Sequence, residues 1–309
     1  MTHTIHGLVP ILATPFHADS SLDIPSLRRL TEFNISGNAE GLAVSGMASE
    51  AFALTAKERQ TILTEVVRIA DGALPVVAGI NGTSTVTAIE QAREAEAGGA
   101  TCLMVLPPFM VKPSAAQLVD FYQDVAAAVD LEVMVQDAPG PTGVQMALST
   151  VVELSKIRGI TSVKVEAPPT AQKVGAVVAA VQSDQFAVLG GNNAQLCLEE
   201  YARGAIGTMP ASEFTDALSV ILDKWNSGNQ DDARKEFAAL LPLLLFGVQP
   251  GLAWAVHKEV LVRRGIIDHA TVRLPAGSLD GATRAALMEV LDALQTPLRH
   301  VKVSPAVVG

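Results

Sequence analysis

A regular alternation between short apolar runs and longer amphipathic segments constrains this fold more than any other feature of the sequence. The apolar runs are rich in Val, Ile, Leu and Ala and hold few charged residues, as strands buried on both faces do. Eight such runs occur, at Gly7–Thr14, Gly41–Ser45, Leu74–Ile80, Cys102–Pro107, Leu131–Asp137, Ile160–Glu166, Phe186–Gly190 and Ala205–Met209. The segments between them follow the period of an amphipathic helix. They are Ile24–Ser36, Ala56–Ala70, Ser84–Ala97, Ala115–Ala128, Leu148–Lys156, Thr170–Val181 and Asn193–Ala202.

Eight strand-and-helix units in succession are typical of the TIM barrel, an α/β fold in which right-handed crossovers bury the strands beneath helices. An eighth helix is expected at Phe214–Trp225, and the turn at Asn226–Asn229 then opens a wholly helical region. That region has three expected helices, at Gln230–Phe246, Gly251–Arg264 and Asp280–Leu294. The sequence therefore predicts a (β/α)8 barrel with the active site over residues 1–226 and a C-terminal three-helix extension over residues 227–309.

Composition and motifs argue against several classes of protein. The 22 Lys and Arg against 32 Asp and Glu give a net charge of −10, and no five basic residues cluster, which argues against nucleic-acid binding. We expect no secretory signal and no membrane span, because no apolar tract reaches roughly 20 residues. Two cysteines without metal-binding spacing favour the cytoplasm. The histidines show no HExxH or i, i+4 spacing and no dinucleotide fingerprint occurs, so neither a metal nor an organic cofactor is expected.

The sixth expected strand, Ile160–Glu166, carries a lysine toward its carboxyl end, where barrel active sites lie. Because side chains alternate along a strand, Ser162, Lys164 and Glu166 are predicted to face the barrel interior. Every other lysine falls in a helical or loop context where solvation is easy. Burial lowers the pKa of an amine and makes it nucleophilic toward a carbonyl, as a Schiff-base lysine must be. A lysine that reaches water or pairs with Glu166 explains the pattern equally well.

Motifs at the other strand ends decide between these interpretations. They are Gly7-Leu-Val-Pro-Ile-Leu-Ala-Thr-Pro-Phe16, Ser45-Gly-Met-Ala-Ser-Glu50, Leu106-Pro-Pro-Phe109, Gln136-Asp-Ala-Pro139 and Gly190-Gly-Asn-Asn193. With Lys164, they resemble the dihydrodipicolinate synthase/N-acetylneuraminate lyase family of class I lyases over all 309 residues. The 28-residue step from Gln136 to Lys164 equals the family's spacing from its strand-five tyrosine to its Schiff-base lysine. The resemblance implies that Lys164 attacks the carbonyl of a 2-keto acid.

Several positions depart from the better-known members of that family. Their proton relay of two threonines, a neighbouring subunit's tyrosine and the strand-five tyrosine is replaced by Met47, Ala48, Phe109 and Gln136. The arginine that holds the aldehyde substrate's carboxylate in dihydrodipicolinate synthases is replaced by Pro141. A role in lysine biosynthesis is therefore not expected. The sequence instead resembles the branch that contains L-2-keto-3-deoxyarabonate dehydratase, with which it shares departures at Ser49–Glu50, Val135–Pro139 and Lys164–Pro168.

An iminium at C2 of a 2-keto acid acidifies the C3 protons, so the reaction needs a base. By strand geometry Glu166 is the ionisable group nearest to Lys164, and we predict that it is this base. Its alternative role is an ion pair that keeps Lys164 charged before substrate arrives. The predicted catalytic residues are therefore Lys164 and Glu166.

The predicted substrate-binding residues are Gly46, Ser49, Gln136, Asn192 and Thr208. The second-strand loop from Gly46 to Ser49 suits the substrate carboxylate, as it does in the family. Gln136 is a neutral amide, so it can position the substrate without taking a proton. Asn192 and Thr208 are expected to meet a polyol chain, whereas Glu50 is expected to anchor structure.

The function that follows is a Schiff-base-forming lyase for a 2-keto-3-deoxy sugar acid, favoured as a dehydratase that yields a product like 2-oxoglutarate semialdehyde. The main alternative is a pyruvate-dependent aldolase or synthase of the same family, such as a 4-hydroxy-tetrahydrodipicolinate synthase-like enzyme. A non-catalytic keto-acid-binding paralogue is the third interpretation. A homotetramer is also expected, because the segments Pro107–Met110 and Leu240–Leu245 are apolar and the family is commonly tetrameric.

Overall fold

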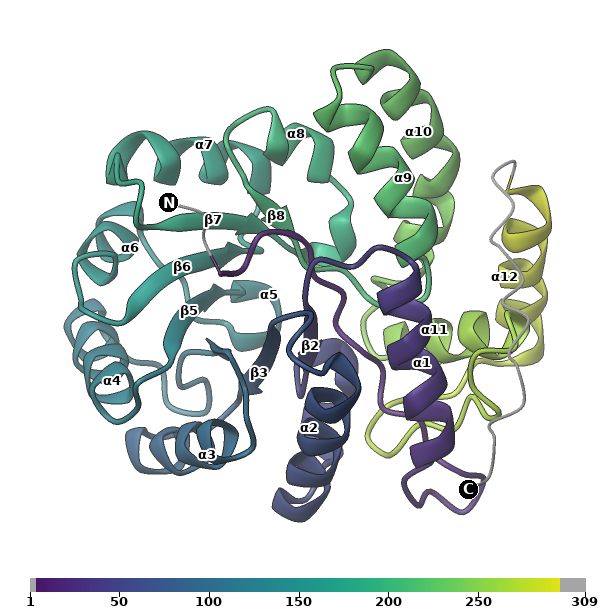
Figure 1. The fold of residues 1–309 in the computed structure, drawn as a ribbon, viewed down its shortest axis with the longest axis horizontal. Helices are drawn as coiled ribbons and strands as arrows, with labels where there is room; N and C mark the ends of the chain where they lie inside the picture. Colours follow the sequence, from purple (N-terminus) through teal and green to yellow (C-terminus); the bar gives the residue numbers. More distant parts are fainter. Residues whose placement is uncertain (1–3, 295–309) are drawn as a thin grey trace.

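The computed structural model describes residues 4–294 and contains the eight parallel strands expected from the sequence. They are β1 (Gly7–Leu8), β2 (Leu42–Val44), β3 (Val76–Ile80), β4 (Cys102–Val105), β5 (Glu132–Asp137), β6 (Ile160–Val165), β7 (Ala187–Gly190) and β8 (Gly207–Thr208). Neighbouring strands follow the order β1-β8-β7-β6-β5-β4-β3-β2, and helices surround the sheet (Figure 1). The predicted α/β class and TIM-barrel architecture are confirmed.

The barrel closes through Ile11, which lies just beyond β1. Ile11 forms parallel bridges with both Ala43 of β2 and Ala211 after β8, so it joins the two edges of the sheet. The prediction of a continuous strand over Gly7–Thr14 is wrong, because regular pairing ends at Leu8. Pro10 has no N–H to give to a neighbouring strand and interrupts the ladder.

The helices cover the outside of the barrel and then continue beyond it. The barrel helices are α1 (Ile24–Ser36), α2 (Ala56–Ala70), α3 (Thr85–Ala97), α4 (Ala115–Ala127), α5 (Pro139–Thr142), α6 (Leu148–Leu154), α7 (Thr170–Val181), α8 (Cys197–Tyr201) and α9 (Thr215–Asn226). Short 3₁₀ turns lie at η1 (Met47–Ser49), η2 (Ala51–Ala53) and η3 (Asn192–Ala194). Local sequence explains several starts, since Thr55 and Glu58 form a capping box at α2.

The helix predicted at Asn193–Ala202 is wrong in its first half. Asn192, Asn193 and Ala194 have φ values of 49°, 53° and 58°, which an α-helix does not tolerate. The regular helix α8 therefore begins only at Cys197. The left-handed residues turn the chain after β7 across the top of the barrel, where they become part of the site described below.

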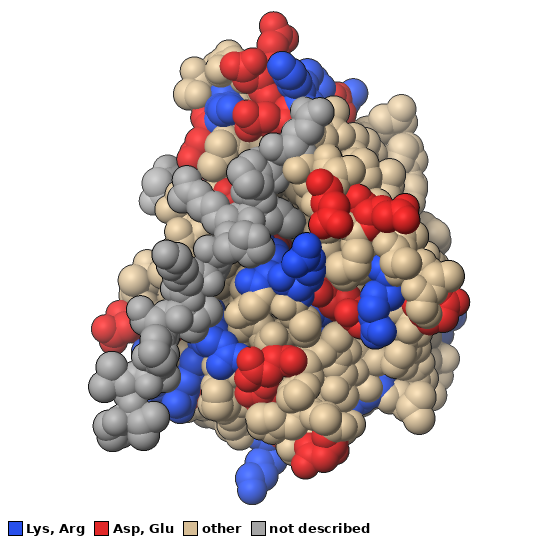
Figure 2. All heavy atoms as spheres, turned by 90° about the vertical axis from the view of Figure 1, so that its right-hand side faces the viewer, with Lys and Arg blue, Asp and Glu red and all other residues tan. Residues whose placement is uncertain are grey.

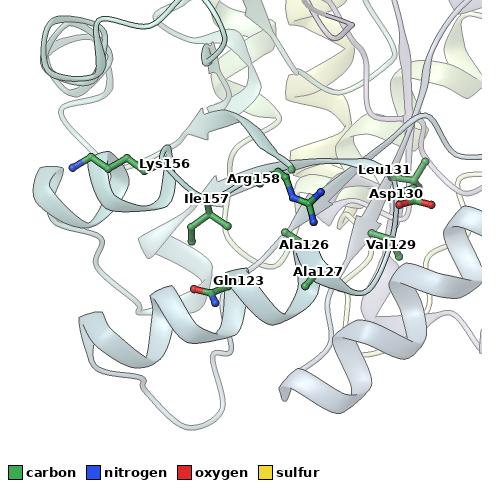
Figure 3. A pocket seen from close by; sticks show the side chains of 10 residues that line it. Gln123, Ala126, Ala127, Val129, Asp130, Leu131, Lys156, Ile157 and Arg158 are labelled. Atoms are coloured by element: carbon green, nitrogen blue, oxygen red, sulfur yellow. The ribbon is translucent and has the colours of Figure 1, made fainter.

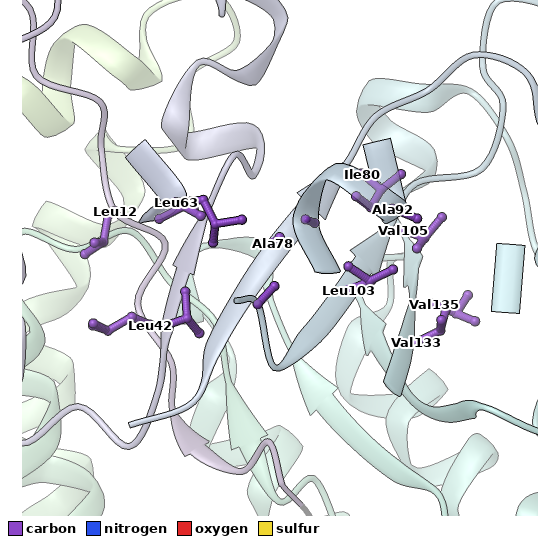
Figure 4. Close-up of a cluster of buried hydrophobic side chains, with 14 of the residues drawn as sticks. Leu12, Leu42, Leu63, Ala78, Ile80, Ala92, Leu103, Val105, Val133 and Val135 are labelled. Carbon is purple, nitrogen blue, oxygen red and sulfur yellow. The ribbon is translucent and has the colours of Figure 1, made fainter. Parts of the chain in front are cut away.

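Apolar side chains pack on both sides of the strands. Outward-facing strand residues share one cluster with residues from the inner faces of the helices, as Val105 of β4 and Ala92 of α3 illustrate in Figure 4. A second cluster fills the barrel interior and includes Met104, Met134 and Leu189. Both clusters consist mainly of aliphatic residues, in keeping with the 4% aromatic content.

The three C-terminal helices are α10 (Gln230–Phe246), α11 (Ala253–Arg263) and α12 (Gly281–Ala293), which lie together on one side of the barrel (Figure 1). Their apolar residues share one cluster with α8 and α9, in which Leu240, Leu243 and Leu244 are buried. The division into domains at residues 226 and 227 stays a prediction, and residues 295–309 of the extension lie outside the described residues.

The surface of the C-terminal side carries charges of both signs. In Figure 2, Lys and Arg lie close to Asp and Glu among the described residues. Ion pairs also join the helices of this region, as Arg284 of α12 does with Glu259 of α11 and Arg234 of α10 with Glu199 of α8. No helix within residues 4–294 combines the length and the apolar character needed to cross a membrane.

Candidate active site

A cavity of about 500 Å³ lies at the carboxyl ends of the strands, where barrel chemistry is located. Its walls come from the loops after β2, β5, β6, β7 and β8 and from the connection between α10 and α11. Lys164 and Glu166 both line this cavity. The structure therefore brings the two predicted catalytic residues together at the expected end of the barrel.

Lys164 projects from β6 into the barrel, as the strand alternation predicts. Its side chain is only 1% exposed and lies in register with Gln136 of β5 and Leu189 of β7. Burial lowers the pKa of the Lys164 amine, while the carboxylate of Glu166 opposes this shift. A lowered pKa increases the fraction of neutral amine, which is the form that attacks a carbonyl.

Glu166 follows β6 and is fixed through both of its carboxylate oxygens. Oε1 accepts a hydrogen bond from the Asn192 amide at 3.0 Å and lies 3.5 Å from Nζ of Lys164. Oε2 accepts a hydrogen bond from the Gln136 side-chain amide at 2.7 Å. Charge-assisted bonds of this kind hold a carboxylate in one orientation. Gln136 is thus a neighbour of Glu166 and does not itself line the cavity.

Gly191 makes room for the lysine and the glutamate. A Cβ at this position would lie 2.5 Å from Cγ of Glu166 and 2.6 Å from Cε of Lys164, closer than real Cβ contacts occur. In the sequence, the Gly190-Gly191 pair opens the Gly190-Gly-Asn-Asn193 motif, which indicates only a family resemblance. Its second glycine instead permits the close approach of two reactive side chains to the backbone after β7.

The loop after β2 holds the predicted residues Gly46 and Ser49 in different settings. Ser49 is buried, and its hydroxyl donates to the Leu12 carbonyl at 2.6 Å, so this hydroxyl supports the loop. Met47 and Ala48, between them, line the cavity. Their amides lie in the first turn of η1, where no intrahelical acceptor is available. Trp254 secures the turn by donating its indole N–H to the Met47 carbonyl at 2.6 Å.

The predicted polyol-binding residues occupy unequal positions. Asn192 lines the cavity, and its side-chain amide makes no hydrogen bond to another described residue. Thr208 is buried beside Gly190 and does not line the cavity, and its Oγ1 has no hydrogen-bond partner among residues 4–294. Asn193 also lines the cavity but is held on both sides, by the Leu244 carbonyl and the Ala211 amide.

The expectation that every lysine other than Lys164 is easily solvated is wrong for Lys258. Lys258 of α11 is also 1% exposed, and its amine contacts Oε1 of Glu50 and donates to the Thr271 carbonyl at 2.7 Å. Burial lowers the pKa of Lys258 to about 8, with Glu50 opposing the shift. Lys258 does not line the cavity. Glu50 therefore anchors structure, as expected, by tying the β2 loop to the C-terminal helices.

A further pair on the cavity wall escaped the sequence analysis. Nδ1 of His257 in α11 lies 2.7 Å from Oε1 of Glu213, which precedes α9, and both side chains are buried. His257 lines the cavity with Lys164. The histidines have no metal-binding spacing in the sequence, and a pair 44 residues apart leaves no periodic signal. Among the described residues, no three His, Cys, Asp or Glu side chains are grouped to hold a metal ion.

A second hollow of about 540 Å³ lies at the opposite end of the barrel. It is lined by the end of α4 and by the loops that precede β5 and β6, including Asp130 and Arg158 (Figure 3). Residues at the amino ends of barrel strands are associated with stability rather than catalysis. The cavity around Lys164 is therefore the candidate active site.

Comparison with known proteins agrees with this geometry. Residues 4–294 match the model of the dihydrodipicolinate synthetase family. The chain belongs to this family. Members of the dihydrodipicolinate synthetase family are lyases that act on small molecules.

Relatives within the family carry different activities. A 4-hydroxy-tetrahydrodipicolinate synthase from Chlorobium luteolum is 30% identical over 95% of this chain and 98% of its own. An L-2-keto-3-deoxyarabonate dehydratase from Azospirillum brasilense is 28% identical over 92% of this chain and 93% of its own. The crystal structure of a dihydrodipicolinate synthase from Rhodopseudomonas palustris superposes with a TM-score of 0.89 at 27% identity, covering 94% of this chain and 98% of that chain. Family membership thus leaves both carbon–oxygen and carbon–carbon bond cleavage open.

Proposed function

We propose that this chain is a Schiff-base lyase that removes water from a 2-keto-3-deoxy sugar acid. One observation carries the proposal: a carboxylate, Glu166, stands 3.5 Å from the buried amine of Lys164 and is held there by Gln136 and Asn192. A base beside the imine nitrogen is well placed to reach the adjacent carbon, C3 of the substrate.

The reaction begins when neutral Lys164 attacks the C2 carbonyl and water leaves, which gives a cationic imine. The cation withdraws electrons from the C3–H bond, and Glu166 removes that proton to form an enamine. The electron pair of the enamine then expels the C4 hydroxyl as water, and the imine becomes conjugated with a C3–C4 double bond. Rearrangement and hydrolysis release a keto aldehyde and restore the free lysine.

The β2 loop supports binding of the substrate's carboxylate. The amides of Met47 and Ala48 open the η1 turn on the cavity wall, and amides in a first helical turn favour anions. Gly46 begins this turn, and a Cβ there would lie 2.9 Å from Cγ2 of Ile11. The absence of a side chain at Gly46 therefore lets the turn pack against the end of β1.

The aldolase or synthase interpretation has one observation in its favour, since relatives of similar identity include several 4-hydroxy-tetrahydrodipicolinate synthases. However, Pro141 lines the cavity at the position where dihydrodipicolinate synthases use an arginine to hold the carboxylate of the aldehyde substrate. Gln136 likewise offers no phenol hydroxyl to carry a proton to an aldehyde. A non-catalytic keto-acid-binding paralogue would have no use for a nucleophilic amine beside a base.

Product analysis tests the proposal. The protein is incubated separately with 2-keto-3-deoxy pentonic and hexonic acids, and with pyruvate plus aldehydes. Dehydration gives a keto aldehyde from the pentonic acid and a 2,5-diketo acid from the hexonic acid, and both products retain every carbon atom of the substrate. Release of pyruvate and an aldehyde, or condensation of the two, would instead establish carbon–carbon lyase chemistry. Binding without turnover of any of these compounds would support the non-catalytic paralogue.

We further propose that the enzyme works in the cytoplasm as a homotetramer. Cys102 and Cys197 are both unpaired and buried, which suits a reducing compartment. Met110 and Val111 are 77% and 79% exposed. They follow Phe109, the position at which better-known members of the family carry the tyrosine that reaches a neighbouring subunit. The Leu240–Leu245 segment offers less support than expected, because Leu240, Leu243 and Leu244 are already buried within the chain.

A further inference from the structure

His257 lines the cavity on the side of the C-terminal helices and is paired with Glu213, which does not itself line the cavity. Glu213 comes from the loop between β8 and α9, and His257 comes from α11. Their side chains are 1% and 5% exposed, and 2.7 Å separates Oε1 of Glu213 from Nδ1 of His257. A hydrogen bond between two buried side chains fixes the orientation of the imidazole ring.

The hydrogen bond to Glu213 engages Nδ1 of the ring. When the carboxylate of Glu213 is ionised it can only accept, so in that state Nδ1 of His257 is the donor. Nε2 is then the ring nitrogen that Glu213 leaves free, and His257 lines the cavity. A carboxylate that orients a histidine in this way is the arrangement that makes imidazole an effective proton carrier in hydrolases.

The cavity wall runs without interruption from the lysine to this ring. Glu166 accepts a hydrogen bond from Asn192, and Asn193 follows directly. A Cβ at Gly247 would lie 2.8 Å from Nδ2 of Asn193 and 2.7 Å from Cε1 of His257, so these two side chains flank the same glycine. Lys164 and His257 line the same cavity, so a hydroxylated chain that is attached to Lys164 and follows this wall would reach His257.

We propose that His257, oriented by Glu213, is the acid that protonates the departing C4 hydroxyl. The inference rests on the proposed dehydration and supplies the proton that this reaction needs. Glu166 takes the C3 proton, the electron pair forms the C2–C3 double bond of the enamine, and the imine nitrogen becomes neutral. The electron pair of the enamine then shifts to form the C3–C4 double bond, and the C4–O bond breaks. The departing oxygen takes a proton from Nε2 of the imidazolium and leaves as water.

The same ring completes the reaction on a five-carbon substrate. The conjugated imine left by the loss of water carries a CH₂OH group at C5. Neutral His257 removes a proton from C5 and so regains the proton that it gave to the C4 hydroxyl. The electrons of the C5–H bond form a dienol conjugated to the nitrogen. Glu166 returns its proton to C3, the enol takes up a proton at C4 as its hydroxyl loses one, and hydrolysis frees Lys164. The sum is the loss of one water, and no oxidant or reductant is needed.

A pair of substrates that differ only in the leaving group tests this role. With enzyme in excess over substrate, so that only the first turnover is seen, we compare 4,5-dihydroxy-2-oxopentanoate with 4-fluoro-5-hydroxy-2-oxopentanoate and follow the consumption of the hydroxy acid or the release of fluoride. Fluoride leaves without being protonated, so His257→Gln should slow loss of the hydroxyl by about 100-fold or more while it changes fluoride release by less than about 5-fold. Glu213→Gln should show the same preference for fluoride, and it serves as the readout if His257→Gln does not fold.

Controls separate the possible failures. His17→Gln replaces a half-exposed histidine 3.8 Å from Asp23, away from the cavity, and should leave both rates unchanged. If His257→Gln slows both leaving groups equally, or neither, His257 is not the acid, although wild-type dehydration would still stand. If the unmodified enzyme eliminates neither group yet forms a borohydride-reducible adduct with pyruvate, the proposed dehydration itself is wrong and this inference is overturned with it.

Discussion

Gln136 donates its side-chain amide to Oε2 of Glu166 across the β5–β6 pair, and this 2.7 Å bond leaves Oε1 facing the amine of Lys164. The strand-five position that carries a tyrosine in better-known members of the family thus contributes to the orientation of a carboxylate. The proton chemistry of this chain is therefore expected to depend on Glu166.

Glu166→Gln should uncouple imine formation from proton transfer. Lys164 remains, so borohydride should still trap a keto acid, whereas exchange of C3 protons with deuterated water should slow by about 100-fold or more. Nuclear magnetic resonance of the recovered substrate measures the exchange. Glu132→Gln, at the opposite end of β5, is the matched control. Near-normal exchange in Glu166→Gln would show that Glu166 is only an ion-pair partner and that another group is the base.

Gly191→Ala should damage the site through contact with its two reactive side chains. The new Cβ would lie 2.5 Å from Cγ of Glu166 and 2.6 Å from Cε of Lys164, so either the side chains or the loop must move. We expect kcat to fall at least about 10-fold, because small displacements of positioned groups are costly to catalysis. Gly281→Ala, where a Cβ would meet nothing within 4 Å, should keep full activity. Equal activity of the two variants would contradict the packing around Gly191.

The parts of this structure that the sequence predicts are those governed by local periodicity. The bounds of α1, α2, α7 and α10 follow from the helical pattern, and the inward direction of Lys164 follows from strand alternation. The strands are shorter than predicted, because pairing in a barrel ends where the chain bends into the next loop. The break before α8 depends on left-handed backbone at Asn192–Ala194, which apolar periodicity does not report.

The missing parts of the site depend on contacts between distant segments. Lys258 occupies an ordinary helical position in the sequence, and only the packing of α11 against the β2 loop buries it against Glu50. His257 meets Glu213 in the same way, through the docking of α11 onto the end of the barrel. A single sequence carries no signal for such pairs, and the spacing of the histidines along the chain does not reveal them.

Glu200 should make stability depend on pH. Burial raises the pKa of this α8 carboxyl to about 7 from its ordinary 4.5, against the hydrogen bond from Thr170. The folded protein therefore holds the proton more tightly, and the stabilisation is complete below about pH 4.5 and is lost as the pH rises through 7. The free energy of unfolding of the wild type, relative to Glu200→Gln, should fall by up to about 3 kcal/mol between pH 4.5 and 8.

Urea unfolding at each pH measures that difference. Glu153→Gln removes an exposed carboxylate of α6 and so controls for the loss of one negative charge. A constant difference between wild type and Glu200→Gln across this range would contradict the raised pKa of Glu200.

The exposed apolar residues after β4 should lie in a subunit interface. Met110 and Val111 are among the most exposed large hydrophobic side chains of the described residues. Light scattering at micromolar concentration should give a mass near four times the 32.3 kDa chain. The double variant Met110→Lys, Val111→Glu should shift the protein to smaller species. A wild-type particle with the mass of one chain would contradict this assembly.

Lys164 as the Schiff-base nucleophile is the central claim, and a single mapping experiment tests it most directly. The protein is incubated with pyruvate and borohydride, digested, and analysed by mass spectrometry. The account predicts one reduced adduct, on the peptide that contains Lys164, and none in Lys164→Ala. Lys258 provides an internal comparison, because it is equally buried but does not line the cavity. An adduct on Lys258 or any other lysine, or no adduct in the wild type, would contradict the account.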